Sequence, residues 1–199
     1  MQTLTEDIVK LKKELRADFI GIRNSISKEE KSVADALIIS HFLSLDIYKN
    51  AKTLFVYSPI GSEIDVIPVA KAALADGKRV AFPACDIESF VLSFHYIRSL
   101  DELKKSIYSV YEPPLYNTCA NQRQDKSTVC IVPALAYNNE RFRIGYGKGY
   151  YDKFLRYFDG ISVGLVYKKL ISDRIIIEKT DMATDVLICE DGVISSAYE

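Results

Sequence analysis

The sequence predicts an α/β domain with a mostly parallel, twisted sheet and helices on both faces. Short apolar, β-branched runs such as 53–57 and 128–135 alternate along the chain with segments whose apolar residues recur at helical spacing. The run 53–57, a helical pattern and a further run at 78–83 follow one another directly. That order is typical of two parallel strands joined by a crossover helix.

The N-terminal quarter predicts two helices. Apolar residues recur every three or four positions over about 6–26, as in an amphipathic helix. Ser27 and Glu30 form the S-x-x-E pattern of a capping box, which predicts a second helix that runs to about Leu45. We expect this helical pair to pack on the α/β domain.

The rest of the chain continues the alternation. Asp65 can cap a helix that carries Pro68 in its first turn and ends at 76–77. Because ligands bind beyond the carboxyl ends of parallel strands, we expect Ser58 to Asp65, Pro83 and Ala134 to Asp152 to share one rim of the sheet. The other expected elements are strands at 90–97, 161–167 and 185–189, a helical turn at 101–105, a loop at 111–127, and a helix that ends near Phe158.

Composition limits the class of protein. With 199 residues, 48% of them hydrophobic, the chain suits a single domain with a real core, and we expect one domain over 1–199. A net charge of −1 argues against a general nucleic-acid binder. The four cysteines form no C-x-x-C pair, which favours free thiols in a reducing compartment over a structural zinc site. No apolar run approaches the ~20 residues of a membrane span. We expect a monomeric, cytoplasmic protein without a membrane or nucleic-acid partner.

The segment 143–152, Arg-Ile-Gly-Tyr-Gly-Lys-Gly-Tyr-Tyr-Asp, is the most informative in the chain. Three of the nine glycines stand there at alternate positions, between an apolar run and a helical pattern. A strand, a glycine-rich loop and a helix in that order can build an anion site, and Arg143 and Lys148 add full charges. We interpret the segment as a phosphate site. The spacing matches neither a Walker A sequence nor G-x-G-x-x-G, and a tight strand–helix turn would also explain the glycines.

Other charged residues allow two interpretations each. Asp152 either complements the dipole of its helix or holds Mg²⁺ beside a phosphate, with Asp181 as a second carboxylate. Lys12 and Arg16, at i and i+4, either grip a nucleotide phosphate or form a solvated helix face. Glu63 and Asp65 can orient a polar substrate, and Asp65 can instead simply cap the helix that follows it.

Taken together, these motifs resemble the 5-formyltetrahydrofolate cyclo-ligase family, also called 5,10-methenyltetrahydrofolate synthetase. The similarity is most specific where Val-Pro-Ala-Leu-Ala-Tyr-Asn at 132–138 precedes the glycine-rich segment. Further family-like motifs occur in the same order over nearly the whole chain, at 12–16, 62–65, 111–113 and 181–188.

Three positions depart from the family pattern. The family usually has glycine at the position of Ala134, aspartate at that of Asn138, and a loop glycine that Arg141 here replaces. All three lie in the turn that enters the site. They therefore affect the geometry of that loop more than its charges, and Asn138 also bears on a contact to metal or substrate.

The resemblance implies an ATP- and Mg²⁺-dependent ligase of folate metabolism. In the family's reaction, ATP phosphorylates the formyl oxygen of 5-formyltetrahydrofolate, N10 attacks the activated carbon, and phosphate leaves. The products are 5,10-methenyltetrahydrofolate, ADP and phosphate. Phosphoryl transfer depends mainly on positioning and charge neutralisation, so a chain without a nucleophilic triad suits it.

The resemblance also implies roles for individual residues. Arg143 and Lys148 would be catalytic, because they would neutralise charge on the transferred phosphoryl group. Asp152 and Asp181 would hold Mg²⁺, and Ser58, Glu63 and Tyr150 would contact the folate. The residues implied in ATP binding are Lys12, Arg16, Arg143, Gly145, Tyr146, Gly147, Lys148, Gly149, Tyr150 and Tyr151.

Two alternatives stay open on the sequence. One is a sugar-phosphate isomerase or CoA-transferase-like enzyme, which can share a related layout. The other is a non-catalytic nucleotide-binding relative, which the three departures would allow. Two separated cation pairs, Lys12/Arg16 and Arg143/Lys148, favour the ligase, because an isomerase has no use for two grips on a triphosphate.

Overall fold

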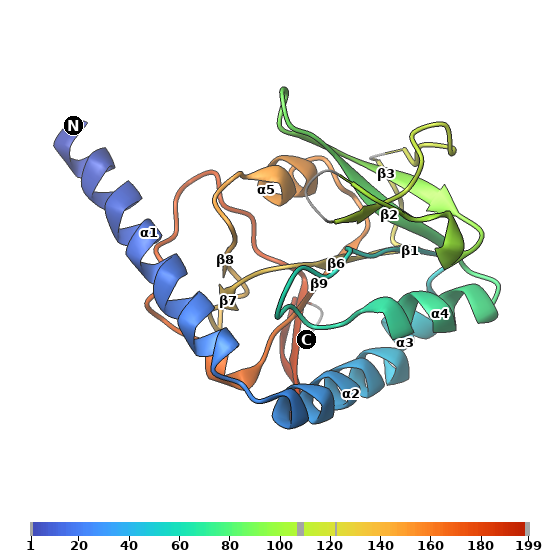
Figure 1. The fold of residues 1–199 in the computed structure, drawn as a ribbon, viewed down its shortest axis with the longest axis horizontal. Coiled ribbons are helices and arrows are strands. Elements are labelled where there is room, and N and C mark those ends of the chain that lie inside the picture. The colour runs from blue at the N-terminus through green and yellow to red at the C-terminus, as the bar shows by residue number, and fades with distance from the viewer. Residues whose placement is uncertain (1, 107–109, 122, 198–199) are drawn as a thin grey trace.

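The computed structural model describes residues 2–106, 110–121 and 123–197, and these form a central sheet covered by helices (Figure 1). The strand order is β11-β10-β9-β6-β1-β2-β3. The inner strands run parallel, whereas the edge strands β3 and β11 pair antiparallel with their neighbours. The strands are β1 (Thr53–Phe55), β2 (Arg79–Asp86), β3 (Val91–Ile97), β6 (Thr128–Val132), β9 (Ile161–Leu165), β10 (Val186–Cys189) and β11 (Gly192–Ser196).

Helices cover both faces of this sheet, which confirms the predicted fold class. On one face, α2 (Lys28–Ser44), α3 (Asp46–Asn50) and α4 (Ile67–Ala75) pack on the sheet, and Ile38 and Phe42 of α2 share an apolar core with Leu54 of β1. On the other face, Phe154 of the short helix α5 (Tyr150–Leu155) packs on Phe94 of β3, with ring centres 4.9 Å apart.

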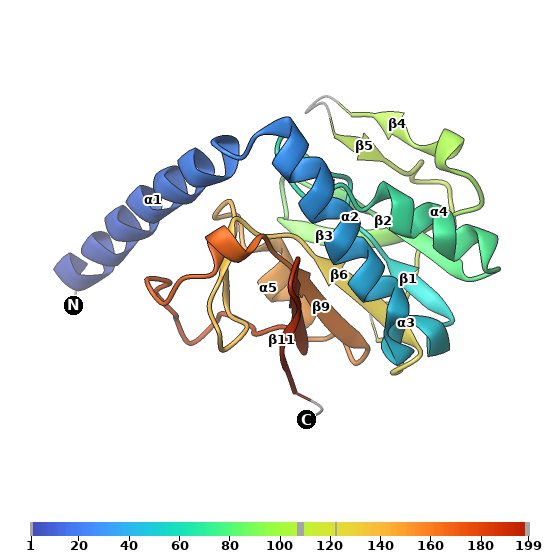
Figure 2. The same ribbon diagram turned by 90° about the horizontal axis from the view of Figure 1, so that it is seen from below.

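The first helix, α1 (Gln2–Asn24), leaves the body of the molecule at its N-terminal end (Figure 2). Leu15 and Phe19 are buried, so the middle of the helix packs on the domain as its amphipathic pattern predicts. The predicted capping box is present, since Ser27 and Glu30 exchange hydrogen bonds at the start of α2. Within the described residues, no helix combines the length and apolarity that a membrane span needs.

Several boundaries differ from the sequence-based expectations. The helix predicted to end near Phe158 ends at Leu155. Pro83 was expected at the carboxyl end of a strand over 78–83, but it lies inside β2, which continues to Asp86. Pairing of β2 with β1 ends at Ala81, so the missing N–H of the proline interrupts no bond on that side. The strand expected over 161–167 ends at Leu165. Residues 166–167 instead lead into the 3-10 turn η2 (Lys168–Leu170).

Some elements had no sequence-based prediction. They are the hairpin β7 (Ala136–Tyr137) with β8 (Arg143–Ile144), the helix α3 and the edge strand β11. The pair β4 (Lys104–Lys105) with β5 (Tyr111–Glu112) contradicts two predictions, because β4 lies in the helical turn expected over 101–105 and β5 in the loop expected over 111–127. A 3-10 turn, η1 (Leu100–Glu102), stands where a helical turn was expected.

The expected rim of the sheet is present. Strands β1 and β6 are parallel neighbours, so their carboxyl ends point to the same edge. The segments that follow them, 56–65 and 133–149, therefore meet at this edge, and α1 crosses it (Figure 1).

Candidate functional site

The glycine-rich loop connects β8 to α5. Gly147 and Gly149 have φ angles of 91° and 69°, in the left-handed region that favours glycine. A Cβ atom at Gly147 would lie 3.0 Å from Cζ of Arg16. The loop therefore needs glycine at this position both for its backbone and for the close approach of the arginine.

Arg16 reaches the loop from α1. Its Nε donates a hydrogen bond of 2.9 Å to the carbonyl oxygen of Gly145, so the two segments are in direct contact. Lys148 is exposed, and its Nζ lies 5.7 Å from the centre of the Phe90 ring. Because α5 has only 6 residues, these side-chain charges matter more here than its helix dipole. The dipole contribution expected from the sequence is therefore small.

Buried Arg143 and half-buried Asp152 form an ion pair behind the loop. Nη2 of Arg143 lies 2.8 Å from Oδ1 of Asp152, and Nη1 donates to the carbonyl oxygen of Met182 over 2.7 Å. The same Asp152 oxygen accepts a 3.2 Å hydrogen bond from the Met182 N–H. Asp152 thus compensates the charge of a buried arginine and fixes the segment that follows Asp181.

Lys12 makes the second link from α1. Its Nζ lies 2.5 Å from Oε2 of Glu178 and 3.1 Å from Oδ2 of Asp181. The Glu178 N–H also donates to Asp181 over 2.8 Å. The structure therefore brings together Lys12 and Asp181, which the sequence assigned to different ligands, and adds Glu178, which the sequence analysis missed.

The carboxylates of the site can accept a metal only together with other ligands. Among the described residues, no group of three or more His, Cys, Asp or Glu side chains could hold an ion by itself. Oδ2 of Asp152 and Oδ1 of Asp181 accept no hydrogen bond from any residue that the structure describes. One or two carboxylates with phosphate oxygens and water are what Mg²⁺ usually takes, so this donor set fits Mg²⁺ that arrives with a phosphate ligand.

The turn after β1 carries Ser58 and Glu63, and both are buried. Ser58 donates its hydroxyl hydrogen to the carbonyl oxygen of Tyr111. Oε2 of Glu63 accepts a 2.8 Å hydrogen bond from the Ile60 N–H. Burial raises the pKa of Glu63, and the Ile60 N–H and the charge of Arg23 lower it in part.

Two tyrosines follow the glycine-rich loop. The hydroxyl of Tyr150 donates to the carbonyl oxygen of Asp86 over 3.4 Å, which ties α5 to the end of β2. The hydroxyl of Tyr151 is buried and has no hydrogen-bond partner among the described residues. A buried hydroxyl without a partner costs about 1–3 kcal/mol, so the position fits a ligand that completes its bonding.

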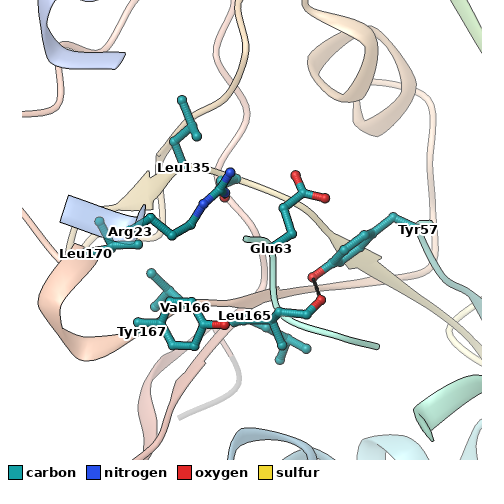
Figure 3. A pocket seen from close by; sticks show the side chains of 10 residues that line it. Arg23, Tyr57, Glu63, Leu135, Leu165, Val166, Tyr167 and Leu170 are labelled. Atoms are coloured by element: carbon teal, nitrogen blue, oxygen red, sulfur yellow. Dashed lines mark hydrogen bonds between the residues drawn. The ribbon is translucent and has the colours of Figure 1, made fainter. Parts of the chain in front are cut away.

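Arg23 is a site residue that the sequence analysis missed. It lies on α1 with Lys12 and Arg16, and 5% of its surface is exposed. Positions i, i+4 and i+11 fall on one face of a helix, and that spacing was the available signal. Arg23 and Glu63 line one cavity, whose volume of about 10 Å³ for the centre of a water-sized sphere suits a single water molecule (Figure 3).

Of the three departures from the family pattern, Asn138 and Arg141 lie in the turn between β7 and β8, and Ala134 lies between β6 and β7. Arg141 has a φ of 70°, so it adopts the left-handed backbone that a glycine would adopt more easily. Its Nε donates to the Thr184 carbonyl oxygen over 2.9 Å. Oδ1 of Asn138 accepts from the Phe142 N–H over 2.9 Å, and the Ala134 carbonyl oxygen accepts from Arg23 over 3.3 Å. The turn is therefore closed by hydrogen bonds despite the substitutions.

Comparisons with known proteins find relatives that match nearly the whole chain. A probable 5-formyltetrahydrofolate cyclo-ligase of Caenorhabditis elegans is 26% identical over 198 residues, covering 94% of this chain and 96% of that protein. The mouse 5-formyltetrahydrofolate cyclo-ligase is 23% identical, with 92% and 96% covered. The NMR structure of Aquifex aeolicus 5,10-methenyltetrahydrofolate synthetase superposes with a TM-score of 0.80 at 30% identity, covering 92% of this chain and 91% of that one.

A second solved structure, the 5,10-methenyltetrahydrofolate synthetase of Mycoplasma pneumoniae, shares the fold with a TM-score of 0.73 at 21% identity, covering 90% of this chain and 98% of that one. The model of the 5-formyltetrahydrofolate cyclo-ligase family matches residues 8–190, which is nearly the whole chain. The chain belongs to the 5-formyltetrahydrofolate cyclo-ligase family, whose members are ligases of folate metabolism.

Proposed function

We propose that the protein converts 5-formyltetrahydrofolate to 5,10-methenyltetrahydrofolate and couples this ring closure to the hydrolysis of ATP to ADP and phosphate, with Mg²⁺. The observation that carries the proposal is the contact between α1 and the glycine-rich loop, where Arg16 lies 2.9 Å from the Gly145 carbonyl oxygen. This contact gathers cations from two distant parts of the chain around one glycine-rich turn. A triphosphate is the ligand that such an arrangement fits best.

Different cations contact the phosphates of the nucleotide from different sides. Lys12 and Arg16 bind phosphate oxygens from the side of α1. Arg143, fixed by Asp152, presents a rigid positive charge behind the loop, whereas exposed Lys148 can move to the γ-phosphate. In phosphoryl transfer the protein acts mainly by positioning the groups and neutralising their charge, so Arg143 and Lys148 stabilise the transferred group.

Magnesium bound to the free oxygens of Asp152 and Asp181 would neutralise charge on the phosphate oxygens. The formyl oxygen forms a bond to the γ-phosphorus as the bond to ADP breaks. N10 then donates its electron pair to the formyl carbon, the carbon–oxygen bond breaks with its electrons on phosphate, and N10 loses its proton. Both steps need the formyl group fixed between the two ligands.

The folate binds beside the turn after β1. Glu63 accepts hydrogen bonds from N–H groups of the pterin ring, and Ser58 lines the same turn. Tyr150 offers a flat aromatic face, and the buried hydroxyl of Tyr151 gains a hydrogen-bond partner from the bound ligands.

The direct test is an assay of the purified wild-type protein with 5-formyltetrahydrofolate, ATP and Mg²⁺. We expect the absorbance of the methenyl product to rise and one ADP to form for each product molecule. Omission of ATP, or chelation of the metal, should stop the reaction. ATP binding without product would indicate a non-catalytic relative, and turnover without ATP would contradict the proposed coupling.

A further inference from the structure

Arg23 joins three segments that the proposed reaction needs in one place. Its Nε donates to Oγ of Ser62 over 3.0 Å, and its Nη1 donates to the Ala134 carbonyl oxygen over 3.3 Å. Its Nη2 donates to the hydroxyl of Tyr146 over 2.6 Å. Ser62 precedes Glu63 in the turn after β1, and Tyr146 belongs to the glycine-rich loop. One buried side chain therefore holds the folate-binding turn and the nucleotide-binding loop together.

The charges around Glu63 come from several elements. Arg23 of α1 and Lys31 of α2 both lower the pKa of this carboxyl against the raising effect of burial. The hydroxyl of Tyr146, from the glycine-rich loop, acts in the same direction as the two cations. Burial raises the pKa of two further tyrosines, Tyr57 just after β1 and Tyr151 in α5, and the charge of Glu63 raises both further.

Figure 3 shows the guanidinium group of Arg23 and the carboxylate of Glu63 on the wall of one cavity, with Tyr57 and Tyr167. Within the described residues the two charged groups form no direct ion pair, so Arg23 acts on Glu63 through its charge and through Ser62. Within the turn, Glu63 accepts a hydrogen bond from the Ile60 N–H, and Ser62 also donates to Oδ1 of Asn24, the last residue of α1, over 2.6 Å.

We propose that Arg23 is a positioning residue that makes folate binding at Glu63 depend on nucleotide binding at the glycine-rich loop. This inference rests on the proposed function, because it concerns how the same two ligands meet. The formyl oxygen must lie in line with the γ-phosphorus, and small misplacements of reacting groups cost about a hundredfold in rate. A residue that bonds to both walls of the site sets that alignment.

The test compares Arg23→Gln and Arg23→Lys with the matched control Arg174→Gln. Arg174 also ties α1 to the domain, through an exposed 2.7 Å ion pair with Asp18, but it contacts neither ligand-binding segment. In the wild type, the KM for 5-formyltetrahydrofolate should fall as the ATP concentration rises. Arg23→Gln should remove most of this dependence and lower kcat about tenfold to a hundredfold. Arg174→Gln should behave as the wild type.

A pH profile separates a positioning role from a purely structural one. If the positive charge of Arg23 is lost, the pKa of Glu63 rises further, so folate binding should need a higher pH in Arg23→Gln. Arg23→Lys keeps a charge and should keep the acidic midpoint near that of the wild type. A packing change that exposes Glu63 would instead lower this midpoint, because burial is what raises the pKa of Glu63.

The outcomes distinguish this inference from the function on which it rests. An inactive wild type overturns both. An active wild type, with a folded Arg23→Gln variant that keeps both the ATP dependence and the pH midpoint, overturns the role of Arg23 alone. If Arg23→Gln fails to fold, Tyr146→Phe and Ser62→Ala each remove one of its hydrogen bonds. Both should weaken the dependence on ATP, and unchanged behaviour of both would refute the inference.

Discussion

Nζ of Lys12 lies 3.1 Å from Oδ2 of Asp181, although 169 positions separate them in the chain. Both side chains are largely buried, with 12% and 19% of their surfaces exposed. The pair connects α1, which carries the proposed phosphate-binding cations, to a carboxylate proposed to hold Mg²⁺. Without a ligand, the proposed phosphate-binding lysine is therefore held in place by a carboxylate of the candidate site.

A double-mutant cycle on this pair tests whether Asp181 acts only through the lysine. We expect Lys12→Met to raise the KM for ATP about tenfold, because one phosphate contact is lost (~1.4 kcal/mol). Asp181→Asn should raise the Mg²⁺ concentration for half-maximal activity in either background. Glu178→Gln is the control, since Glu178 also pairs with Lys12 but is not a proposed metal ligand. If Asp181→Asn leaves the Mg²⁺ requirement unchanged, Asp181 is not a metal ligand and acts only through its ion pair with Lys12.

Lys148 and Lys153 offer a matched pair of lysines. Both are exposed, and both place Nζ within 6 Å of the Phe90 ring, at 5.7 and 5.5 Å. Lys148→Ala should lower kcat about a hundredfold, since a lost charge contact to the transition state costs about 3 kcal/mol. Lys153→Ala should keep activity within about threefold, and neither change should shift the melting temperature. Equal effects of both variants on kcat would mean that Lys148 has no special role.

Glycine at position 147 should matter for both the backbone and Arg16. Alanine there faces a φ of 91° and a 3.0 Å contact with Cζ of Arg16. We expect Gly147→Ala to lower the free energy of unfolding by about 1–2 kcal/mol and to weaken ATP binding. At Gly145 a Cβ meets no atom within 4 Å and the φ is not positive, so Gly145→Ala should change stability by much less. Chemical denaturation of the two variants compares them directly.

The raised pKa of Glu63 predicts a pH-dependent gain in stability for Glu63→Gln. Because burial raises the pKa in the folded state, the folded protein binds the Glu63 proton more tightly than the unfolded chain does. The contribution of this group to stability is thus largest below its ordinary pKa and is lost as the pH rises through the raised value. Relative to the wild type, Glu63→Gln should become more stable across that range while losing folate affinity. A stability difference that stays constant with pH would contradict this account.

Much of the fold was predictable because it follows from local patterns. The capping box at Ser27 and Glu30 and the apolar runs at β1 and β6 each depend on a few neighbouring residues. The capping box and both strands are present, although β1 ends at Phe55 and β6 at Val132, short of the predicted ends at 57 and 135. The strand β11 was missed because Asp191-Gly192 is a turn signal that was not used, although Gly192 has a φ of 122° there. Two-residue strands such as β7 and β8 carry no periodicity at all.

The charged residues of the candidate site could be predicted from the sequence, but the contacts between them could not. The sequence predicted functional roles for Arg143 and Asp152, but their 2.8 Å ion pair depends on how β8 meets α5. Arg23 lies on the same face of α1 as Arg16. Its proposed positioning role, however, depends on hydrogen bonds to residues 39 to 123 positions away in the chain. Long-range contacts of this kind depend on the tertiary fold, which spacing along the chain does not describe.

The most direct measurement is a crystal structure of the protein with a non-hydrolysable ATP analogue and Mg²⁺. We predict that the triphosphate lies against the loop 145–149, with phosphate oxygens within hydrogen-bonding distance of Lys12 and Arg16. We also predict that Lys148 turns from Phe90 toward the γ-phosphate. A nucleotide bound elsewhere, with Lys12 still paired to Asp181 and the glycine-rich loop in contact with solvent alone, would contradict the proposed site.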